Sequence, residues 1–198
     1  MNFRNLLVGL SCIVGLAACA VAPTQEMADA RAELKAAEEA GAKEYAGAPL
    51  ASARRGMAEA EQQLALGNFS DARESAALAR EDAARAKAVA DAIGRARRAL
   101  DRAEAVHAPS SAAEAALKSA QDAARGGDDR HAVAEAVRAE QLAALGENQA
   151  ALEEARRLLQ SCPAGNRARH AELLRKATEA IADGQGATAL DYVARACR

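Results

Sequence analysis

Small apolar residues recur every three or four positions between residues 69 and 107, and many of the positions between them are charged. This heptad seam is typical of a helix that packs lengthwise against other helices. Only Arg97 interrupts it, and the segment contains no proline and one glycine, Gly94. The pattern therefore predicts one long helix of roughly 58 Å. The seam consists of Phe69, Ala72, Ala76, Ala79, Ala83, Ala86, Ala90, Ile93 and Leu100.

Seams of the same kind predict the other helices. One comprises Met27, Ala30, Leu34 and Ala37, and a second comprises Leu50, Ala53, Met57, Ala60 and Leu64. Another long helix is expected over about 128–161, where Gly146 is the weak point. The predicted helices span about 24–40, 48–66, 69–107, 111–125, 128–161, 166–182 and 186–197.

Three kinds of marker recur along the chain with a period of roughly 60 residues. The first is a proline, at Pro49, Pro109 and Pro163, and the second is a glycine turn, at 67–68, 126–128 and 184–186. The third is an arginine-containing stretch, at 30–34, 96–100 and 155–159. Because the three markers are in phase, we predict three internal repeats, which cover residues 24–92, 93–150 and 151–198.

Each repeat is predicted to contain a helix, a proline-bearing loop, a second helix, a glycine turn and a third helix. Ser111 and Glu114 predict a capping box, and Asn68 and Asp128 are expected to cap the helices that follow glycine turns. The third helix of one repeat continues into the first of the next. The predicted fold is therefore all-α, with three overlapping three-helix bundles that share long helices, as in spectrin-type arrays. A compact solenoid of helical hairpins and a single globular bundle are the alternatives.

Composition agrees with long helices and excludes two classes of protein. Alanine occupies 59 of the 198 positions, and only 2% of the residues are aromatic. The formal net charge is −2 with 27% charged residues, so the chain lacks the clustered basic surplus of a nucleic-acid-binding protein. Balanced charge and periodic apolar residues also exclude intrinsic disorder. Alanine seams bury little area per residue, so we expect modest stability that is spread along the molecule.

The first residues predict export and attachment to a membrane. Arg4 precedes an apolar run from Leu6 to Ala18, and the run ends in Leu-Ala-Ala before Cys19. A transmembrane helix requires ~20 apolar residues, so this shorter run is typical of a signal peptide. The ending resembles the bacterial lipobox, in which the cysteine receives fatty acyl chains such as palmitate. We therefore predict a signal peptide over 1–18, lipidation at Cys19 and a tether over 19–23; an ordinary cleaved signal is the main alternative.

The residue after the predicted lipidation site bears on location. It is Ala20, whereas an aspartate there often retains a lipoprotein in the inner membrane of Gram-negative bacteria. By resemblance to that sorting rule, we expect an outer-membrane lipoprotein of the cell envelope that faces the periplasm.

Two further cysteines are predicted to form a disulfide. The signal peptide would remove Cys12, so Cys162 and Cys197 remain as free thiols in an oxidising compartment. They end the first and third predicted helices of the last repeat, and these ends meet at one pole of an up-down-up bundle. The bond would stabilise the chain by roughly 3–4 kcal/mol. Two unpaired thiols and an intermolecular bond are the alternatives.

Candidate chemistry is sparse along the rest of the chain. The histidines His107, His131 and His170 lie near helix boundaries, and none has a partner at a metal-ligand spacing. Ser110 and Ser111 lack the surroundings of a nucleophilic serine, and Gly126-Gly127 lacks the basic residue of a phosphate loop. Glu38 and Glu39 point in different directions on a helix. We predict no catalytic, cofactor-binding or metal-binding residues.

The strongest local charge is a cluster of four arginines on the long helix. Asp91, Asp101 and Glu104 lie among them, so a solvated face is favoured over a site for an anionic ligand. The cluster consists of Arg95, Arg97, Arg98 and Arg102.

Residues 24–92 resemble a family of uncharacterised bacterial envelope lipoproteins. The resemblance rests on a tyrosine loop, Glu44-Tyr45-Ala46, on a proline start, Pro49-Leu50, and on a glycine-aromatic turn, Gly67-Asn68-Phe69. The resemblance implies a helical domain of unknown function with no catalytic residues. Some members of this family end in an OmpA-like peptidoglycan-binding domain, whereas this chain continues after Ala92 with further helical repeats.

Two classes of function are compatible with these features. The first is a non-catalytic, lipid-anchored helical module that presents long faces to partner proteins in the cell envelope. The second is an envelope enzyme, or a subunit that modulates one, which would need a polar cleft that alanine seams do not provide. We therefore expect a scaffold or interaction protein that is not an enzyme. Its expected partners are a membrane, through the lipid, and an envelope protein, without nucleic acid or a small-molecule substrate.

Overall fold

The computed structural model describes residues 22–197, and this part of the chain contains nine helices and no strand. The all-α fold predicted from the heptad seams is confirmed. The helices are α1 (Thr24–Glu39), α2 (Ala42–Tyr45), α3 (Gly47–Ala65), α4 (Phe69–Ala105), α5 (Ser111–Arg125), α6 (Asp129–Ser161), α7 (Ala164–Arg169), α8 (Ala171–Ala182) and α9 (Gly186–Cys197).

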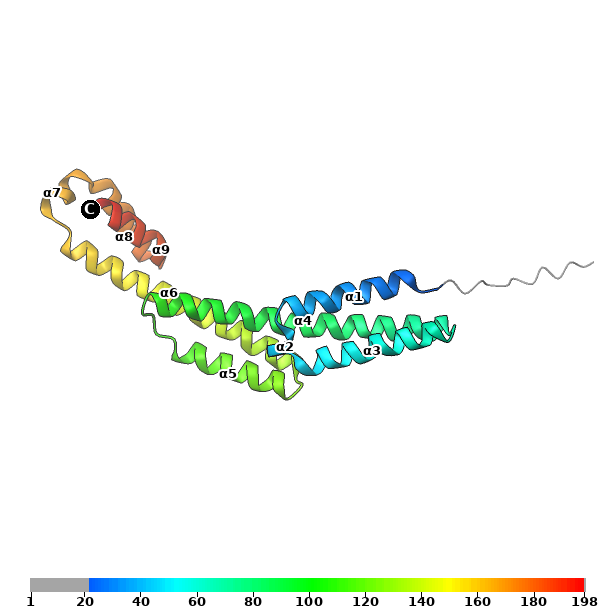
Figure 1. The fold of residues 1–198 in the computed structure, drawn as a ribbon. Helices are drawn as coiled ribbons and strands as arrows, with labels where there is room; N and C mark the ends of the chain where they lie inside the picture. The colour runs from blue at the N-terminus through cyan, green and yellow to red at the C-terminus, as the bar shows by residue number, and fades with distance from the viewer. Residues whose placement is uncertain (1–21, 198) are drawn as a thin grey trace, which may run out of the picture.

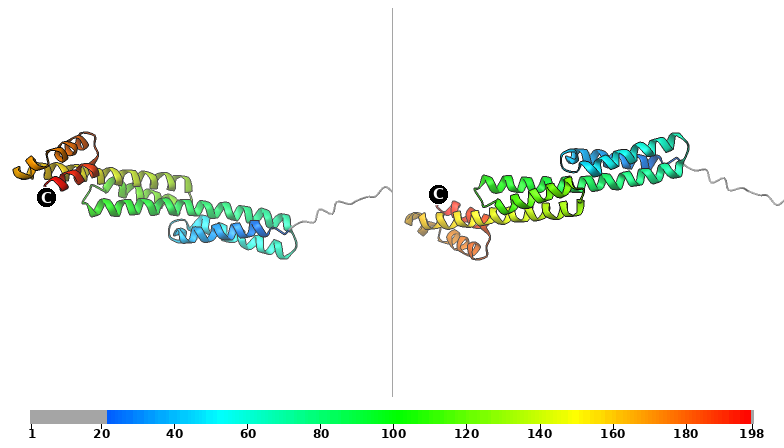
Figure 2. Two further views of the ribbon diagram at one scale, coloured as in Figure 1. Left: turned by 90° about the horizontal axis from the view of Figure 1, so that it is seen from above. Right: turned by 90° about the horizontal axis from the view of Figure 1, so that it is seen from below.

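The two long helices each take part in two groups of helices, which gives an elongated molecule (Figures 1 and 2). The first bundle consists of α1, α3 and the N-terminal part of α4. The second bundle consists of the C-terminal part of α4, α5 and the N-terminal part of α6, and the third consists of the rest of α6 with α8 and α9. The long parallel helices are therefore staggered, and each overlaps the next for part of its length.

Helix α4 can join two bundles because it has two buried seams. The first seam, which the sequence analysis identified, is buried from Ala72 to Ile93 and faces the first bundle. A second seam begins at Val89 and continues in steps of three and four. It consists of Val89, Ala92, Ala96, Ala99 and Ala103, all at most 1% exposed.

The buried residues divide into unequal cores. One cluster runs without a break from Ala37 in α1 to Ala143 in α6, so the first and second bundles share a core. A smaller cluster around Met27 and Met57 fills the far end of the first bundle. The third bundle has its own core, centred on Ala155, Ala177 and Val193. The third bundle is therefore a separate packing unit.

Ion pairs between the parallel helices lie at heptad spacing. Arg95 contacts Glu140 at 3.3 Å, and Arg102 contacts Glu147 at 3.6 Å. On both helices the second residue lies seven positions after the first. Two residues of the arginine cluster thus pair across the α4–α6 interface. The pairs are about half exposed, so each contributes at most about 1 kcal/mol, and they act mainly on register.

The structure corrects the sequence analysis in four places. The tyrosine loop contains a short helix, α2, and the predicted helix 166–182 is two helices, α7 and α8, which meet at His170. The predicted capping box of Ser111 and Glu114 is not formed. The residue before α5 is Ser110, and its hydroxyl donates a hydrogen bond to the Glu114 carboxylate instead of capping the backbone. Asn68 does not cap α4, since its side-chain nitrogen donates to the Gln63 side chain instead. Asp128 does cap α6, since its carboxylate accepts from the His131 backbone amide at 3.0 Å.

The predicted disulfide between Cys162 and Cys197 is present. The two Cα atoms are 5.1 Å apart, within the range that a disulfide spans. Cys162 directly follows α6 and Cys197 ends α9, so the bond joins the two helices that form the outer end of the third bundle. Because that bundle has a small core, we expect the cross-link to contribute substantially to its stability.

We predict that Ala86→Pro destabilises the first and second bundles together. Ala86 is fully buried in the middle of α4, and proline there removes a backbone hydrogen bond and kinks the helix, at a cost of about 3 kcal/mol or more. Chemical denaturation followed by circular dichroism measures the loss. Ala164→Pro is the control, because it places proline at the first residue of α7 after an extended residue, and it should be nearly neutral.

We predict that loss of the disulfide destabilises the third bundle. The double substitution Cys162→Ser with Cys197→Ser should lower the free energy of unfolding of that bundle by roughly 3–4 kcal/mol, because the unfolded chain gains entropy. Limited proteolysis should then cut within α8 and α9 first. Thiol labelling of the unfolded, non-reduced protein should label neither cysteine, and labelling of both would contradict the intramolecular bond.

Candidate functional site

The junction between the first and second bundles is closed by helix α2. Ala42 and Ala46 are buried in the core that the two bundles share, and the Tyr45 ring packs against it. One amino group of Arg97 donates to the Tyr45 hydroxyl at 2.7 Å and lies 3.2 Å from the Glu44 carboxylate. The guanidinium carbon is also 5.9 Å from the centre of the ring, within cation–π range.

This contact explains the break in the α4 seam. The hydrogen bond to Tyr45 and the charge of Glu44 raise the pKa of Arg97 above its ordinary value, so the side chain stays charged. Arg97 lies on the first seam of α4, past the end of α1. At this point α2, instead of α1, packs against α4. The interruption therefore marks the contact between the two bundles.

The junction between the second and third bundles has a different construction. Within residues 22–197, neither α4 nor α5 contacts α7, α8 or α9. At the first junction, by contrast, α2 and α3 both contact α5. The third bundle is thus joined to the second through α6 alone.

An open groove of about 950 Å³ lies at this second junction. One end is formed by Val106 and His107, which follow α4, and the walls are formed by α6 and α9. The residues of α9 in the walls form one stripe of that helix, whereas those of α6 are spread over more than half of its circumference. The wall residues are Ala144, Glu147, Asn148, Ala150, Ala151, Glu153, Glu154 and Arg157 of α6, and Ala187, Leu190, Asp191 and Ala194 of α9.

The groove has a floor of small apolar residues and a rim of charged side chains. Four carboxylates line it, and three of them are ion-paired: Glu147 with Arg102, Glu154 with Arg157 and Asp191 with Arg195. Arg157 forms hydrogen bonds of 2.7 and 2.6 Å to Glu154, and these lower the pKa of Glu154 and raise that of Arg157. Glu153 is exposed and has no ion-pair partner among the described residues. The charges along the rim are therefore largely balanced within residues 22–197.

Asn148 holds the two walls together. Its side-chain oxygen accepts from the Gly186 backbone amide at 2.9 Å, and its side-chain nitrogen donates to the Gly184 carbonyl at 3.0 Å. A Cβ at Gly186 would overlap the Asn148 backbone carbonyl, so the close approach of α9 to α6 requires glycine there. A Cβ at Gly146 would lie 2.7 Å from the Pro109 carbonyl oxygen, so this glycine allows α6 to pass the α4–α5 loop.

His107 has an unusual backbone conformation at the end of the groove. Its φ is +54°, and it is the only residue other than glycine with a positive φ in the described part of the chain. The amide of His107 donates to the Glu104 carbonyl and that of Ala108 to the Ala103 carbonyl, both at 2.9 Å. This is the Schellman pattern that ends a helix, and Gly127 occupies the same position after α5.

Asp129 is the first residue of α6, near Asp82 and Arg85 of α4. Its carboxylate oxygen Oδ1 is buried and has no hydrogen-bond partner among residues 22–197. Burial raises the pKa of Asp129 above its ordinary value, Arg85 lowers it, and the negative charges of Asp128 and Asp82 raise it further. The group is a local weakness at the first junction and does not adjoin the groove.

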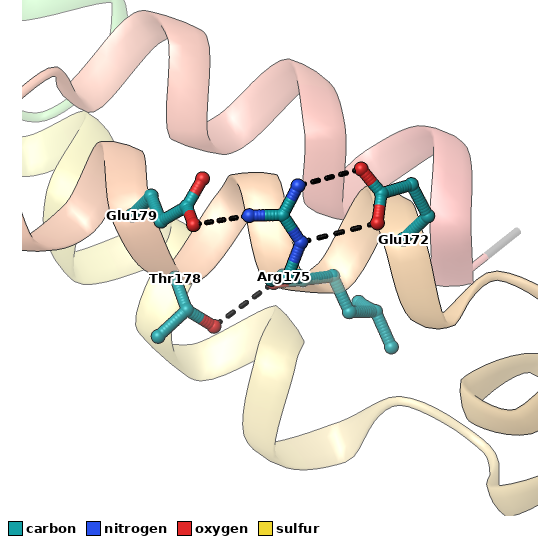
Figure 3. Close-up of polar contacts among 5 residues, drawn as sticks. Glu172, Arg175, Thr178 and Glu179 are labelled. Carbon is teal, nitrogen blue, oxygen red and sulfur yellow. Dashed lines mark hydrogen bonds and ion pairs between the residues drawn. The ribbon is translucent and has the colours of Figure 1, made fainter.

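The outer face of α8 carries a local network of charged residues (Figure 3). Arg175 contacts Glu172 at 2.7 Å and also pairs with Glu179, and Glu172 and Glu179 raise the pKa of Arg175. Thr178 donates to the Leu174 carbonyl at 2.9 Å. All these partners lie on one exposed helix, so the network is a solvated face that supports α8.

The remaining candidate residues are dispersed. Cys19, the signal peptide over 1–18 and most of the tether lie outside the described residues, so their predictions stand untested. His107, His131 and His170 lie at three different helix boundaries, and no group of His, Cys, Asp or Glu within residues 22–197 is arranged to hold a metal ion. Glu38 pairs with Arg54 and Glu39 with Lys35. No described helix is long and apolar enough to span a membrane.

The sequence analysis missed the groove and the role of Arg97. The break in the seam at Arg97 and the nearby tyrosine loop were the available signals for the first junction. No signal in the sequence marks the groove, because its alanines and glutamates resemble those of any exposed helical face. The groove depends on the positions along α6 at which α4 ends and α9 begins.

Comparison with known proteins gives one match. Residues 25–94 match the sequence profile of a domain of unknown function (DUF4398), which is about a third of the chain. The matched segment covers α1, α2, α3 and the part of α4 up to Gly94, and it ends three residues before Arg97. The domain of unknown function thus corresponds to the first bundle. No curated protein and no solved structure matches the chain.

We predict that His107→Gly stabilises the protein by about 1 kcal/mol, because the left-handed conformation costs an L-residue with a side chain roughly 1–2 kcal/mol. Denaturant unfolding measures the gain. The control is Gly127→Ala at the equivalent position after α5, which should cost a similar amount. A loss of stability in His107→Gly would mean that the imidazole makes a compensating contact.

We predict that Asp129→Asn raises the melting temperature at neutral pH. Because the native pKa of Asp129 is raised, the native state binds its proton more tightly than the unfolded state, and stability falls as pH rises above the ordinary carboxyl pKa. The gain should shrink as the pH is lowered and the wild-type side chain becomes protonated. Thermal unfolding across pH tests this, and Asp71→Asn, in the exposed first turn of α4, should show no such gain.

Proposed function

We propose that this protein is a non-catalytic helical interaction module of the bacterial cell envelope, anchored to the outer membrane by a lipid on Cys19 and facing the periplasm. The observation that carries the proposal is the staggered array of helices with an open groove at its second junction. Such arrays present long faces and suit binding to other proteins. Three overlapping bundles of the spectrin type are the architecture that we propose for it.

The position of the proposed anchor supports this arrangement. Helix α1 begins at Thr24, so a lipid on Cys19 would leave only a few residues between the membrane and the first bundle. The groove is lined by α6 and α9. Helix α9 lies toward the opposite end of the molecule from the start of α1 (Figure 1). A partner in the periplasm could therefore reach the groove without contacting the membrane.

The first bundle provides a second line of support. It matches a domain of unknown function. The tyrosine loop, proline start and glycine-aromatic turn of the same residues resemble those of envelope lipoproteins, some of which carry an OmpA-like domain. In the present chain, the second and third bundles occupy the place of such a domain. We propose that they provide the contacts with partners, while the first bundle connects them to the anchor.

We predict that Cys19→Ala releases the protein from the membrane fraction, because it removes the proposed acylation site. Fractionation with a carbonate wash, followed by immunoblotting, measures the release. Cys12→Ala is the control and should have no effect, since the signal peptide would be removed. A Cys19→Ala protein that remains in the washed membranes would contradict the lipid anchor.

The interaction function itself is tested by crosslinking in the native envelope. A photoreactive residue at one exposed alanine of each bundle, Ala77, Ala112 or Ala187, samples the length of the molecule. We expect at least one position to trap a defined envelope protein, identified by mass spectrometry, in the wild type and less in Cys19→Ala. Adducts at none of the three positions would contradict an interaction module.

A further inference from the structure

The turn between α3 and α4 carries two large apolar side chains at one end of the first bundle. Leu66, which directly follows α3, is 64% exposed, more than any other large hydrophobic residue among residues 22–197. Phe69, the first residue of α4, is half-buried and packs against none of the three cores of the described chain. Both side chains therefore lie outside the packing that holds the first bundle together.

Three glycine turns of the chain share one backbone conformation but differ in polarity. Each has a glycine with positive φ, at Gly67, Gly127 or Gly184, and the same pair of backbone hydrogen bonds closes each turn. The residue before this glycine and the second residue after it are leucine and phenylalanine at the first turn. They are glycine and aspartate at the second turn, and aspartate and glycine at the third. The backbone conformation itself therefore does not require large apolar residues.

The first turn contains no charge. Positions 62–70 are all uncharged, and the nearest charged residues in the sequence are Glu61 and Asp71. The side-chain nitrogen of Asn68 donates to the side-chain oxygen of Gln63 at 2.9 Å, so these two polar groups satisfy each other. Transfer of a surface out of water is costly mainly for charges and for polar groups without a hydrogen-bond partner. This surface can therefore leave water at low cost.

The turn lies at the same end of the molecule as the start of α1 (Figures 1 and 2). An ion pair of 2.6 Å between Arg73 and Glu26 places the first turns of α4 and α1 side by side. The side chain of Pro23 is fully buried, so the chain is fixed to the bundle from that residue onward. Even fully extended, the chain from Cys19 to Pro23 spans at most about 14 Å. A lipid on Cys19 would therefore hold the turn close to the bilayer surface.

From these observations we infer that Leu66 and Phe69 insert into the surface of the bilayer that holds the lipid anchor. The inference rests on the proposed lipid anchor and adds a second contact with the same membrane. The apolar side chains would lie at the boundary between headgroups and acyl chains. The anchor would keep the turn at a high effective concentration beside the bilayer, so a weak apolar contact is sufficient. Two contacts would also restrict the direction in which the array leaves the membrane.

Fluorescent probes at two equivalent positions test the inference. Asn68→Cys places an environment-sensitive probe in the first turn, and Gln185→Cys, at the same exposed backbone position of the third turn, is the control. Labelling is selective, because Cys162 and Cys197 are bonded to each other and Cys19 would carry the lipid. The lipidated full chain is bound to protein-free vesicles of phosphatidylethanolamine and phosphatidylglycerol. We expect the emission of the probe at 68 to shift to shorter wavelength and to be quenched by lipids with a nitroxide near the top of the acyl chain, and the probe at 185 to show neither effect.

Matched variants separate insertion from proximity to the membrane. Leu66→Ser together with Phe69→Ser should reduce the quenching at position 68 to the level of the control probe, and Leu66→Ser alone should reduce it in part. Leu78→Ser removes an exposed leucine from α4 in the same bundle, and it should leave the quenching unchanged. Circular dichroism verifies that each variant is folded, and sedimentation with the vesicles verifies that its lipid remains inserted.

Three results would overturn the inference. They are equal quenching of the two probes, absence of a shift at position 68 in the vesicles, or quenching that persists after Leu66 and Phe69 are both replaced. A dimer of the Cys19→Ala chain that the double substitution converts to a monomer in analytical ultracentrifugation would also overturn it, since the turn would then contact a second copy. The anchor is tested separately: release of Cys19→Ala from the membrane fraction, with no quenching at position 68 in the lipidated chain, would support the anchor and reject the contact of the turn.

Discussion

Close packing along alanine seams is the constraint on which the rest of this structure depends. A seam of alanine lets two helices approach closely, but each residue buries little apolar area, so stability requires long contacts. Helix α4 achieves this with two seams that overlap between Val89 and Ile93, where the first and second bundles meet. The staggered arrangement of parallel helices follows, because one helix with two seams can join two bundles without a linker.

The two junctions use this arrangement differently. At the first, a continuous core, α2 and the contact of Arg97 with Tyr45 join the bundles into one packing unit. At the second, only α6 connects the bundles, and the third bundle has its own small core and a disulfide at its outer end. The molecule therefore combines a cohesive N-terminal part with a C-terminal bundle that is stabilised separately, and the groove lies where the two meet.

Charged residues have structural roles in this molecule that a count of charges does not reveal. Arg95 and Arg102 pair across the α4–α6 interface and fix its register, and Arg97 contacts the tyrosine of α2. The networks on the outer faces of single helices, such as that of Arg175, support only local helix structure (Figure 3). At the groove, three of the four lining carboxylates are likewise paired, with Arg102, Arg157 and Arg195.

Periodicity, proline and glycine predicted the two long helices and most of the shorter ones, because 3.6-residue spacing and helix-breaking residues act locally. The boundaries of the long helices follow from that local information, whereas the pairing of Cys162 with Cys197 also required an assumed up-down-up order of helices in the last bundle. The helix in the tyrosine loop, the partner of Arg97 and the second seam of α4 required the tertiary structure, since each depends on which helix lies alongside α4. The groove depends on the ends of α4 and α9 meeting on α6, a relation between residues distant in sequence that no local pattern encodes.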